Sequence, residues 1–496
     1  MVPVDSQSNP PLSDVLTAPA TEIAASGDES FLPARNAVSP RTVVGWAADS
    51  LLVAILTPFL ALASPRVPRL LLAIVILDIP LQLGTHLYYQ EKDAAVGALG
   101  GLSISATTVA LAGLYVSWFI RTSIRKDFSL RSSLQINLPL FLYITVSALS
   151  VSVAQDVPLA LFEVTLLLES GLLFLYVANV VRTRRDVLFV VSLLLIACLL
   201  ESVIMTAMRV TVTPSTTWDL PIHLRADWAA HGTFMRIGGT VGSPNVAAGY
   251  LSISLALAAS VLFTNLPRAY KVLAMWVLGL GSVALILTFS RGGWIALMLA
   301  VALLSFGAWR RRGLSLKMPI ATAAVLLLLL LPFHSLVSAR LFGDDSGSAE
   351  SRVPLMNLAF RIVEANPVLG VGANNFTVVM NRYLSPEFRQ GFLFAVHNKY
   401  LLVLAETGLV GLLAFLAFLL GAVRKGWQCW RDCEEPLSSL ALGLTAGIAG
   451  HMVHMTVDVF RGRPTQQLVW LIAGLLTAIY RMRPASCSSD SLRLIS

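Results

Sequence analysis

The chain has 496 residues, of which 56% are hydrophobic and 13% are charged. Soluble domains carry about 25% charged residues, so this composition excludes an ordinary soluble protein. The net charge of +8 does not indicate nucleic acid as a partner, because Lys and Arg gather in short segments between apolar runs. That distribution is typical of the loops on the cytoplasmic side of a membrane protein.

The first 42 residues are polar and rich in Ser, Pro and Ala, and they predict a disordered tail, 1–42. Behind them lie apolar runs of the length that a helix needs to cross a bilayer. We therefore expect an all-α polytopic membrane protein with about 12–13 transmembrane helices. The predicted spans are 44–63, 67–85, 100–120, 136–155, 158–180, 187–210, 243–263, 271–289, 292–309, 317–337, 397–423, 437–458 and 466–480.

If the most basic loops lie in the cytoplasm and successive loops alternate between the two sides of the membrane, two long segments lie outside the cytoplasm. In the larger one, apolar spacing from Ser351 to Ala365 predicts an amphipathic helix on the membrane surface, followed by a bend at Gly370 and Gly372. The predicted organisation is transmembrane helices over 43–210, a periplasmic loop 211–242, transmembrane helices over 243–337, a large periplasmic loop 338–396, transmembrane helices over 397–481, and a cytoplasmic tail 482–496.

His397 stands where the large loop meets an apolar helix. An imidazole at such a boundary is neutral near pH 7 and can accept a proton, so His397 is a candidate general base toward an acceptor hydroxyl. The alternative is a polar residue that only begins the helix. Asn398 can cap that helix or orient the ring.

The sequence Ser290-Arg291-Gly292-Gly293 places an arginine at an external membrane boundary. Its planar guanidinium suits phosphate oxygens, and the glycines let a ligand approach the backbone. The alternative is a snorkelling arginine in a tight turn.

Arg236 opens another glycine-rich external segment, which leads to Asn245 in the first turn of a span. Free N–H groups there suit an anion, and the alternative is a simple turn of the chain. Arg361 in the large loop is either a substrate contact or part of a solvated face. His451 and His454 share a helix face without a nearby carboxylate cluster, and we interpret them as packing groups, with no metal site.

These residues together resemble the O-antigen ligase/polymerase superfamily of bacterial membrane glycosyltransferases, over about 236–420. The matching elements are Arg236 with Gly242-Ser243-Pro244-Asn245, Ser290-Arg291-Gly292-Gly293, Arg361, Asn366-Pro367-Val368-Leu369-Gly370-Val371-Gly372, Asn375-Phe376, and His397-Asn398 with Tyr400-Leu401, Glu406, Gly408 and Gly411.

The resemblance implies a GT-C-like helical bundle in the bacterial inner (plasma) membrane, with its active site facing the periplasm. It implies transfer of a glycan from an undecaprenyl-diphosphate donor to a hydroxyl on a glycan, a lipid A core or another acceptor, with inversion and with no cofactor or metal. Arg236 and Arg291 would hold the diphosphate, and His397 would take the hydroxyl proton. Asn245, Arg361 and Asn398 would be further substrate-binding residues. An O-antigen ligase and an exopolysaccharide or O-antigen polymerase fit equally, with membrane lipids as the other partners.

A transporter or flippase for lipid-linked glycans is the alternative. It predicts cationic residues deep within several spans and little need for a long external loop, whereas here the arginines lie at the external edge. A membrane scaffold or sensor would explain the spans but not the set formed by Arg236, Arg291 and His397.

Overall fold

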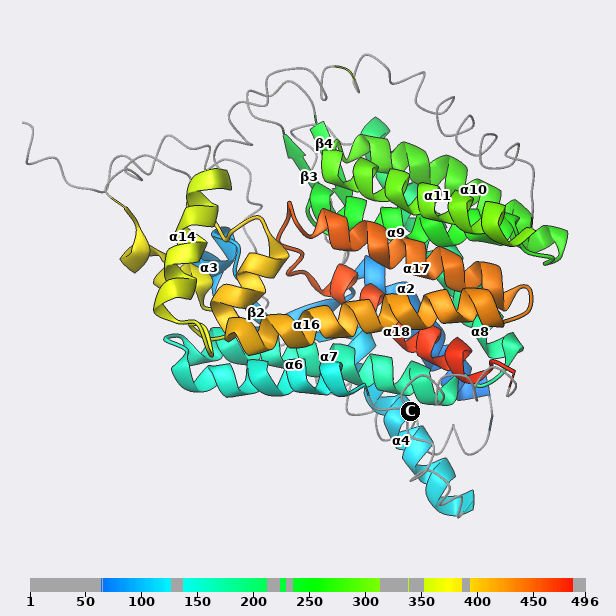
Figure 1. Cartoon of the computed structure of the whole chain (residues 1–496), viewed down its shortest axis with the longest axis horizontal. Coiled ribbons are helices and arrows are strands. Elements are labelled where there is room, and N and C mark those ends of the chain that lie inside the picture. Colours follow the sequence, from blue (N-terminus) through cyan, green and yellow to red (C-terminus); the bar gives the residue numbers. More distant parts are fainter. Residues whose placement is uncertain are drawn as a thin grey trace, which may run out of the picture. The chain divides into compact units, whose positions relative to one another are not determined.

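The computed structural model describes residues 64, 66–125, 137–211, 224–228, 235–312, 338, 352–385 and 393–484. Helices make up most of these ranges, and Figure 1 shows long helices packed along one another. Six of the described helices are long and apolar enough to cross a membrane, which confirms the predicted all-α polytopic class. They are α7 (Val157–Val180), α8 (Arg184–Thr211), α9 (Pro244–Leu262), α10 (Arg268–Leu287), α11 (Arg291–Arg312) and α16 (Lys399–Asp432).

Other helices of the bundle also coincide with predicted apolar runs. They are α2 (Arg66–Leu81), α4 (Ala106–Arg125), α6 (Leu138–Leu149), α17 (Leu437–His454) and α18 (Arg463–Arg481). The predicted spans 44–63 and 317–337, the tail 1–42 and the residues after 484 lie outside the described residues.

The centre of the bundle is formed by α9, α17 and α18, whose residues are almost all buried. Small residues allow close helix approach where no water drives association. A Cβ atom at Gly450 of α17 would lie 2.3 Å from the carbonyl oxygen of Ala296 in α11, so only glycine fits there. α16 packs against α17, α18 and α6 around this centre (Figure 1).

Two antiparallel strand pairs lie in connections between helices. β1 (Gly84–Tyr89) pairs with β2 (Gly101–Ser105), and the short helix α3 (Glu91–Ala95) joins them. β3 (Arg225–Trp228) pairs with β4 (Met235–Gly239) within the predicted loop 211–242. The expected span 67–85 therefore runs past the end of α2 into β1, and the expected span 100–120 begins in β2, before α4. The Asp78 carboxylate accepts the backbone N–H of Leu83 at 2.7 Å, which ends the helical bonding of α2.

The large loop contains α14 (Arg352–Ala365), α15 (Phe376–Val379) and the short 3-10 helix η6 (Met380–Tyr383). Another 3-10 helix, η3 (Ser150–Val153), follows α6 outside this loop. α14 has the extent that the sequence predicts. Its buried residues Leu355, Leu358 and Ile362 pack in one cluster with Leu402 and Ala405 of α16. This face of α14 covers protein, whereas Val353 and Phe360 of the same helix are exposed. The expectation that α14 lies on the membrane surface stays a prediction.

α16 breaks at Gly408, where the sequence predicted an uninterrupted span. Gly408 has φ 69° and ψ −172°, outside the helical region. The segment 367–372 fills this break, because the N–H of Leu409 donates to the carbonyl of Pro367 at 2.9 Å and the N–H of Val371 donates to that of Ala405 at 2.9 Å. The loop motif 366–372 and the helix motif 406–411 therefore meet each other.

Candidate active site

His397 directly precedes the Asn398 cap of α16, and its neighbours on both sides in the sequence, Phe394 and Asn398, hold it in position. Its ring packs on Phe394 with 5.2 Å between centroids. The Asn398 side chain accepts the N–H groups of Tyr400 and Leu401 at 3.0 and 3.1 Å, so it caps α16. The backbone N–H of Lys399 donates to the carbonyl of Met455 at 2.9 Å, which joins the start of α16 to the end of α17.

The charged neighbours of His397 come from two other elements. Asp458 lies in the connection after α17, which ends at His454, so the expectation that Asp458 lies within a span was wrong. Burial lowers the pKa of His397, Asp458 acts to raise that pKa, and Arg352 at the start of α14 acts to lower it. Because the net direction is downward, the imidazole is neutral near pH 7, as a general base must be.

Arg236 in β4 connects two elements of the site. Its Nε donates to the carbonyl of Thr288 at 2.9 Å, and its Nη2 donates to Oδ1 of Asn245 at 2.7 Å. Thr288 ends α10, and Asn245 lies in the first turn of α9. The structure therefore brings two of the predicted substrate-binding residues into direct contact, and it fastens them to the turn that carries Arg291.

α11 begins at Arg291, and the turn before it packs on α17. The Ser290 hydroxyl lies 3.4 Å from Nε2 of His454. A Cβ atom at Gly292 would lie 2.4 Å from the His454 ring, and one at Gly293 would lie 2.6 Å from the Cβ atom of Ala248. These glycines make room for a histidine ring and for α9. The expectation that they admit a ligand to the backbone stays a prediction.

His454 contacts the turn that precedes Arg291, and the next residue, Met455, accepts the N–H of Lys399. The turn before Arg291 and the start of α16 beside His397 therefore meet at the end of α17. Within the described ranges, no three His, Cys, Asp or Glu side chains are grouped so that they could hold a metal ion.

Arg361 has a different environment. Its Nε donates to the carbonyl of Tyr383 at 2.8 Å, and Asn366 Nδ2 donates to the Tyr383 hydroxyl at 3.0 Å. These bonds hold η6 against α14. The described contacts of Arg361 do not include another predicted site residue.

Sequence reasoning missed the short connection between α17 and α18. Arg461 forms a buried ion pair with Glu406 of α16 and donates to Oδ1 of Asn374 at 2.6 Å. Phe460 packs against the rings of His451 and His454, with centroids 4.5 and 4.7 Å away. A signal was present, because an arginine in an external connection runs against the positive-inside trend, as it does at Arg291.

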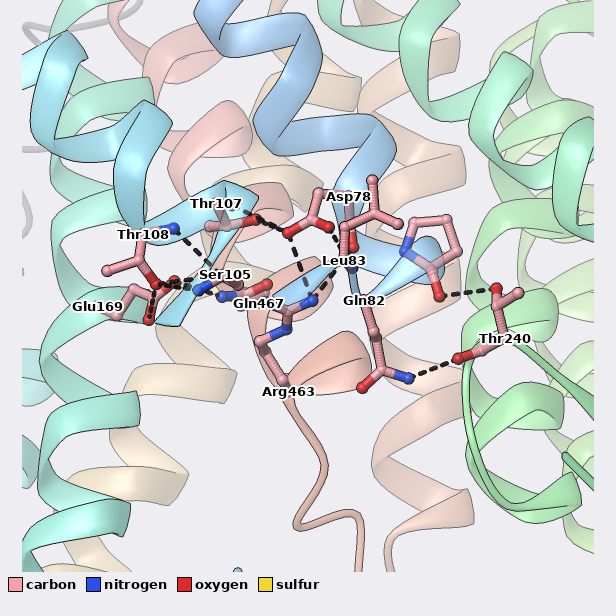
Figure 2. A network of polar contacts seen from close by, with 11 residues as sticks. Asp78, Gln82, Leu83, Ser105, Thr107, Thr108, Glu169, Thr240, Arg463 and Gln467 are labelled. Carbon is pink, nitrogen blue, oxygen red and sulfur yellow. Dashed lines mark hydrogen bonds and ion pairs between the residues drawn. The ribbon is translucent and has the colours of Figure 1, made fainter. Parts of the chain in front are cut away.

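A buried polar network lies at the start of α18 (Figure 2). Arg463 pairs with Asp78 at 3.3 Å, and the same carboxylate accepts the N–H and hydroxyl of Thr107 at 2.9 and 2.7 Å. Gln467 Nε2 donates to Glu169 at 3.1 Å. The segment 43–210, for which the sequence predicts transmembrane helices, thus holds the start of α18, directly after the connection that carries Asp458 and Arg461.

Residues 273–416 match the model of a family described as O-Antigen ligase. The match includes Arg291 and His397, and over this segment it supports the resemblance to the O-antigen ligase/polymerase superfamily. No curated protein matches the chain.

A solved structure titled "Structural coordination of polymerization and crosslinking by a peptidoglycan synthase complex" aligns with 17% identity. The alignment covers 70% of this chain and 98% of that one, with a TM-score of 0.36, which is too low to establish a common fold.

Proposed function

We propose that this protein is an inverting membrane glycosyltransferase that moves a glycan from an undecaprenyl-diphosphate donor to an acceptor hydroxyl on the periplasmic side of the inner membrane. The observation that supports the proposal is that the turn before Arg291 and the start of α16 beside His397 meet at the end of α17, in a chain segment that matches the O-antigen ligase family model. Ligase and polymerase reactions share this chemistry.

In the proposed reaction the acceptor oxygen attacks the anomeric carbon, and the bond from that carbon to the diphosphate oxygen breaks. His397 takes the hydroxyl proton, and undecaprenyl diphosphate leaves with the bonding electrons. Nδ1 of His397 is buried without a hydrogen-bond partner in the described part of the chain, so Nε2 is the nitrogen that we assign to the acceptor. A positioned base of this kind contributes about 10²–10⁴-fold to the rate.

The leaving diphosphate gains negative charge as the bond breaks. Guanidinium groups at the site would stabilise that charge more strongly in the transition state than in the ground state. We assign Arg291 to direct phosphate contact. Arg236 already donates to Thr288 and Asn245, so we assign it to holding the α9 and α10–α11 ends in place. Asn398 supports His397 by capping α16.

The test is complementation of a strain that lacks the gene, with polysaccharide read on a gel at matched membrane levels of each variant. Wild type should restore the glycan, and His397→Ala and Arg291→Ala should not. Arg382→Ala is the matched control, because Arg382 is exposed on η6 and has no contact with the site in the described residues. Loss of chain length would identify a polymerase, and loss of attachment would identify a ligase. Full restoration by His397→Ala would contradict the proposal and favour a flippase.

A further inference from the structure

A cavity lies inside the bundle, where the first turn of α16, the end of α17 and the start of α18 come together. Its walls include Lys399, His451, Met455, Thr465 and Trp470. Each of these residues is at most 6% exposed, so they line the interior of the bundle and not its surface.

Three polar side chains in this wall lack the bonds that buried groups normally make. Oγ1 of Thr465 is buried and has no hydrogen-bond partner in the described part of the chain. The His451 ring packs on Phe460 but forms no hydrogen bond with a described residue. The Lys399 side chain likewise makes no hydrogen bond or ion pair there. Buried polar groups that lack protein partners are usually bound to ordered water.

Lys399 has charged neighbours, but none of them binds it directly. Glu163, Glu406 and Arg461 act on it electrostatically. The Glu406 carboxylate is already paired with Arg461 and accepts the N–H of Phe376. Oε2 of Glu163 is itself buried without a hydrogen-bond partner in the described residues. The Lys399 ε-amino group therefore has no acceptor among these residues, and burying such a donor unpaired is unfavourable.

The size and the chemistry of the cavity favour water as its occupant. Its volume is about 20 Å³, and about 10–15 Å³ is enough to admit one water molecule. Cavities that stay empty are apolar, whereas an internal water molecule needs about two to four polar partners. Lys399, Thr465 and His451 supply partners in that number. The isoprenoid chain of a lipid does not fit in this volume.

We propose that this cavity is a binding site for ordered water, through which Lys399 binds the first turn of α16 to Thr465 of α18 and His451 of α17. The backbone N–H of Lys399 already joins α16 to the carbonyl of Met455 at 2.9 Å. Water, and not a direct ion pair, then fixes the side-chain end of the same turn, which begins two residues after His397. The inference concerns how the helices are held together, and it does not depend on glycan transfer.

The experiment is X-ray hydroxyl-radical labelling of the full-length protein in nanodiscs, read by mass spectrometry. The radicals form from water, so a buried side chain is oxidised where a water molecule lies next to it. Met455 and Trp470 report on the cavity. Met205 of α8 is the matched control, because it is 0% exposed and does not line the cavity. The variants are Thr465→Val, Lys399→Met and the double variant, each taken from the folded size-exclusion peak.

In wild type, Met455 and Trp470 should be oxidised and Met205 should not. Oxidation of both reporters should fall in Thr465→Val and in Lys399→Met, and it should fall furthest in the double variant, because each change removes one polar partner of the water.

If Met455 and Trp470 are oxidised no faster than Met205, the cavity is dry and the inference is wrong. If they are oxidised in wild type and equally in all three variants, the water is not bound by Lys399 and Thr465, and the inference is again wrong. Neither result bears on the proposed function, which complementation tests separately.

Discussion

At the scale of single residues, the reactivity of His397 depends on a balance between opposing neighbours. Burial disfavours the charged imidazolium, Asp458 favours it, and Arg352 disfavours it. A base with too low a pKa takes protons poorly, and one with too high a pKa is already protonated at the working pH. Asp458 therefore offsets part of the effect of burial on the pKa of His397, which favours the general-base role that we propose for this residue.

Replacing Asp458 by Asn should test this balance. Without the carboxylate, the pKa of His397 falls further, so the acidic limb of the kcat/KM profile should move to lower pH while the maximal rate falls. The measurement is the pH dependence of kcat/KM for glycan transfer by Asp458→Asn and by wild type, and a limb that moves upward for Asp458→Asn would show that Asp458 does not act through His397.

At the scale of elements, the break in α16 decides where the loop can dock. Gly408 lies in the left-handed region, and a Cβ atom there would lie 1.9 Å from the carbonyl oxygen of Val368. The backbone bonds between 367–372 and 405–409 hold the loop beside Glu406, whose carboxylate also accepts the N–H of Phe376 at 3.1 Å. α14 and α15 are thereby anchored to the helix that begins beside His397.

Gly408→Ala should destabilise the protein. The left-handed conformation alone costs an L-residue about 1–2 kcal/mol, and the Val368 carbonyl would have to move as well. Gly421→Ala in the same helix is the matched control, because nothing lies within 4 Å of its Cβ position. Alanine there should be neutral or stabilising by about 0.5–1 kcal/mol. The measurement is the temperature at which half of the detergent-solubilised protein leaves the folded size-exclusion peak, and equal temperatures for the two variants would contradict this account.

At the scale of the whole molecule, local sequence signals were sufficient for the spans, for α14 and for the Asn398 cap, since each depends on residues within a few positions of one another. The contact between Arg236 and Asn245 spans nine positions and was not foreseen. The pairing of Glu406 with Arg461 joins α16 to the connection between α17 and α18, and that of Asp78 with Arg463 joins α2 to α18. Such pairs leave no periodic signal, because either partner alone is only an isolated charge near an apolar run.

The pair formed by Asp78 and Arg463 gives a test of the bundle as a whole, since it ties α2 to α18 (Figure 2). Asp78 is 1% exposed, so Arg463→Ala leaves a buried carboxylate without its countercharge, which costs about 3–5 kcal/mol. Combining Asp78→Asn with Arg463→Gln removes both charges and should recover much of the loss, because Asn can still accept from Thr107.

The control is Arg69→Ala, which removes a surface pair with Asp186 in which Arg69 is 65% exposed. Pairs of this kind contribute about 0–1 kcal/mol, so its unfolding temperature in detergent should stay near that of wild type. If Arg463→Ala unfolds at the same temperature as Arg69→Ala, the segment before residue 210 does not brace α18 through this charge. If the double variant unfolds at a higher temperature than Arg463→Ala, the loss in the single variant arises from the unpaired carboxylate and not from the missing side-chain volume of the arginine.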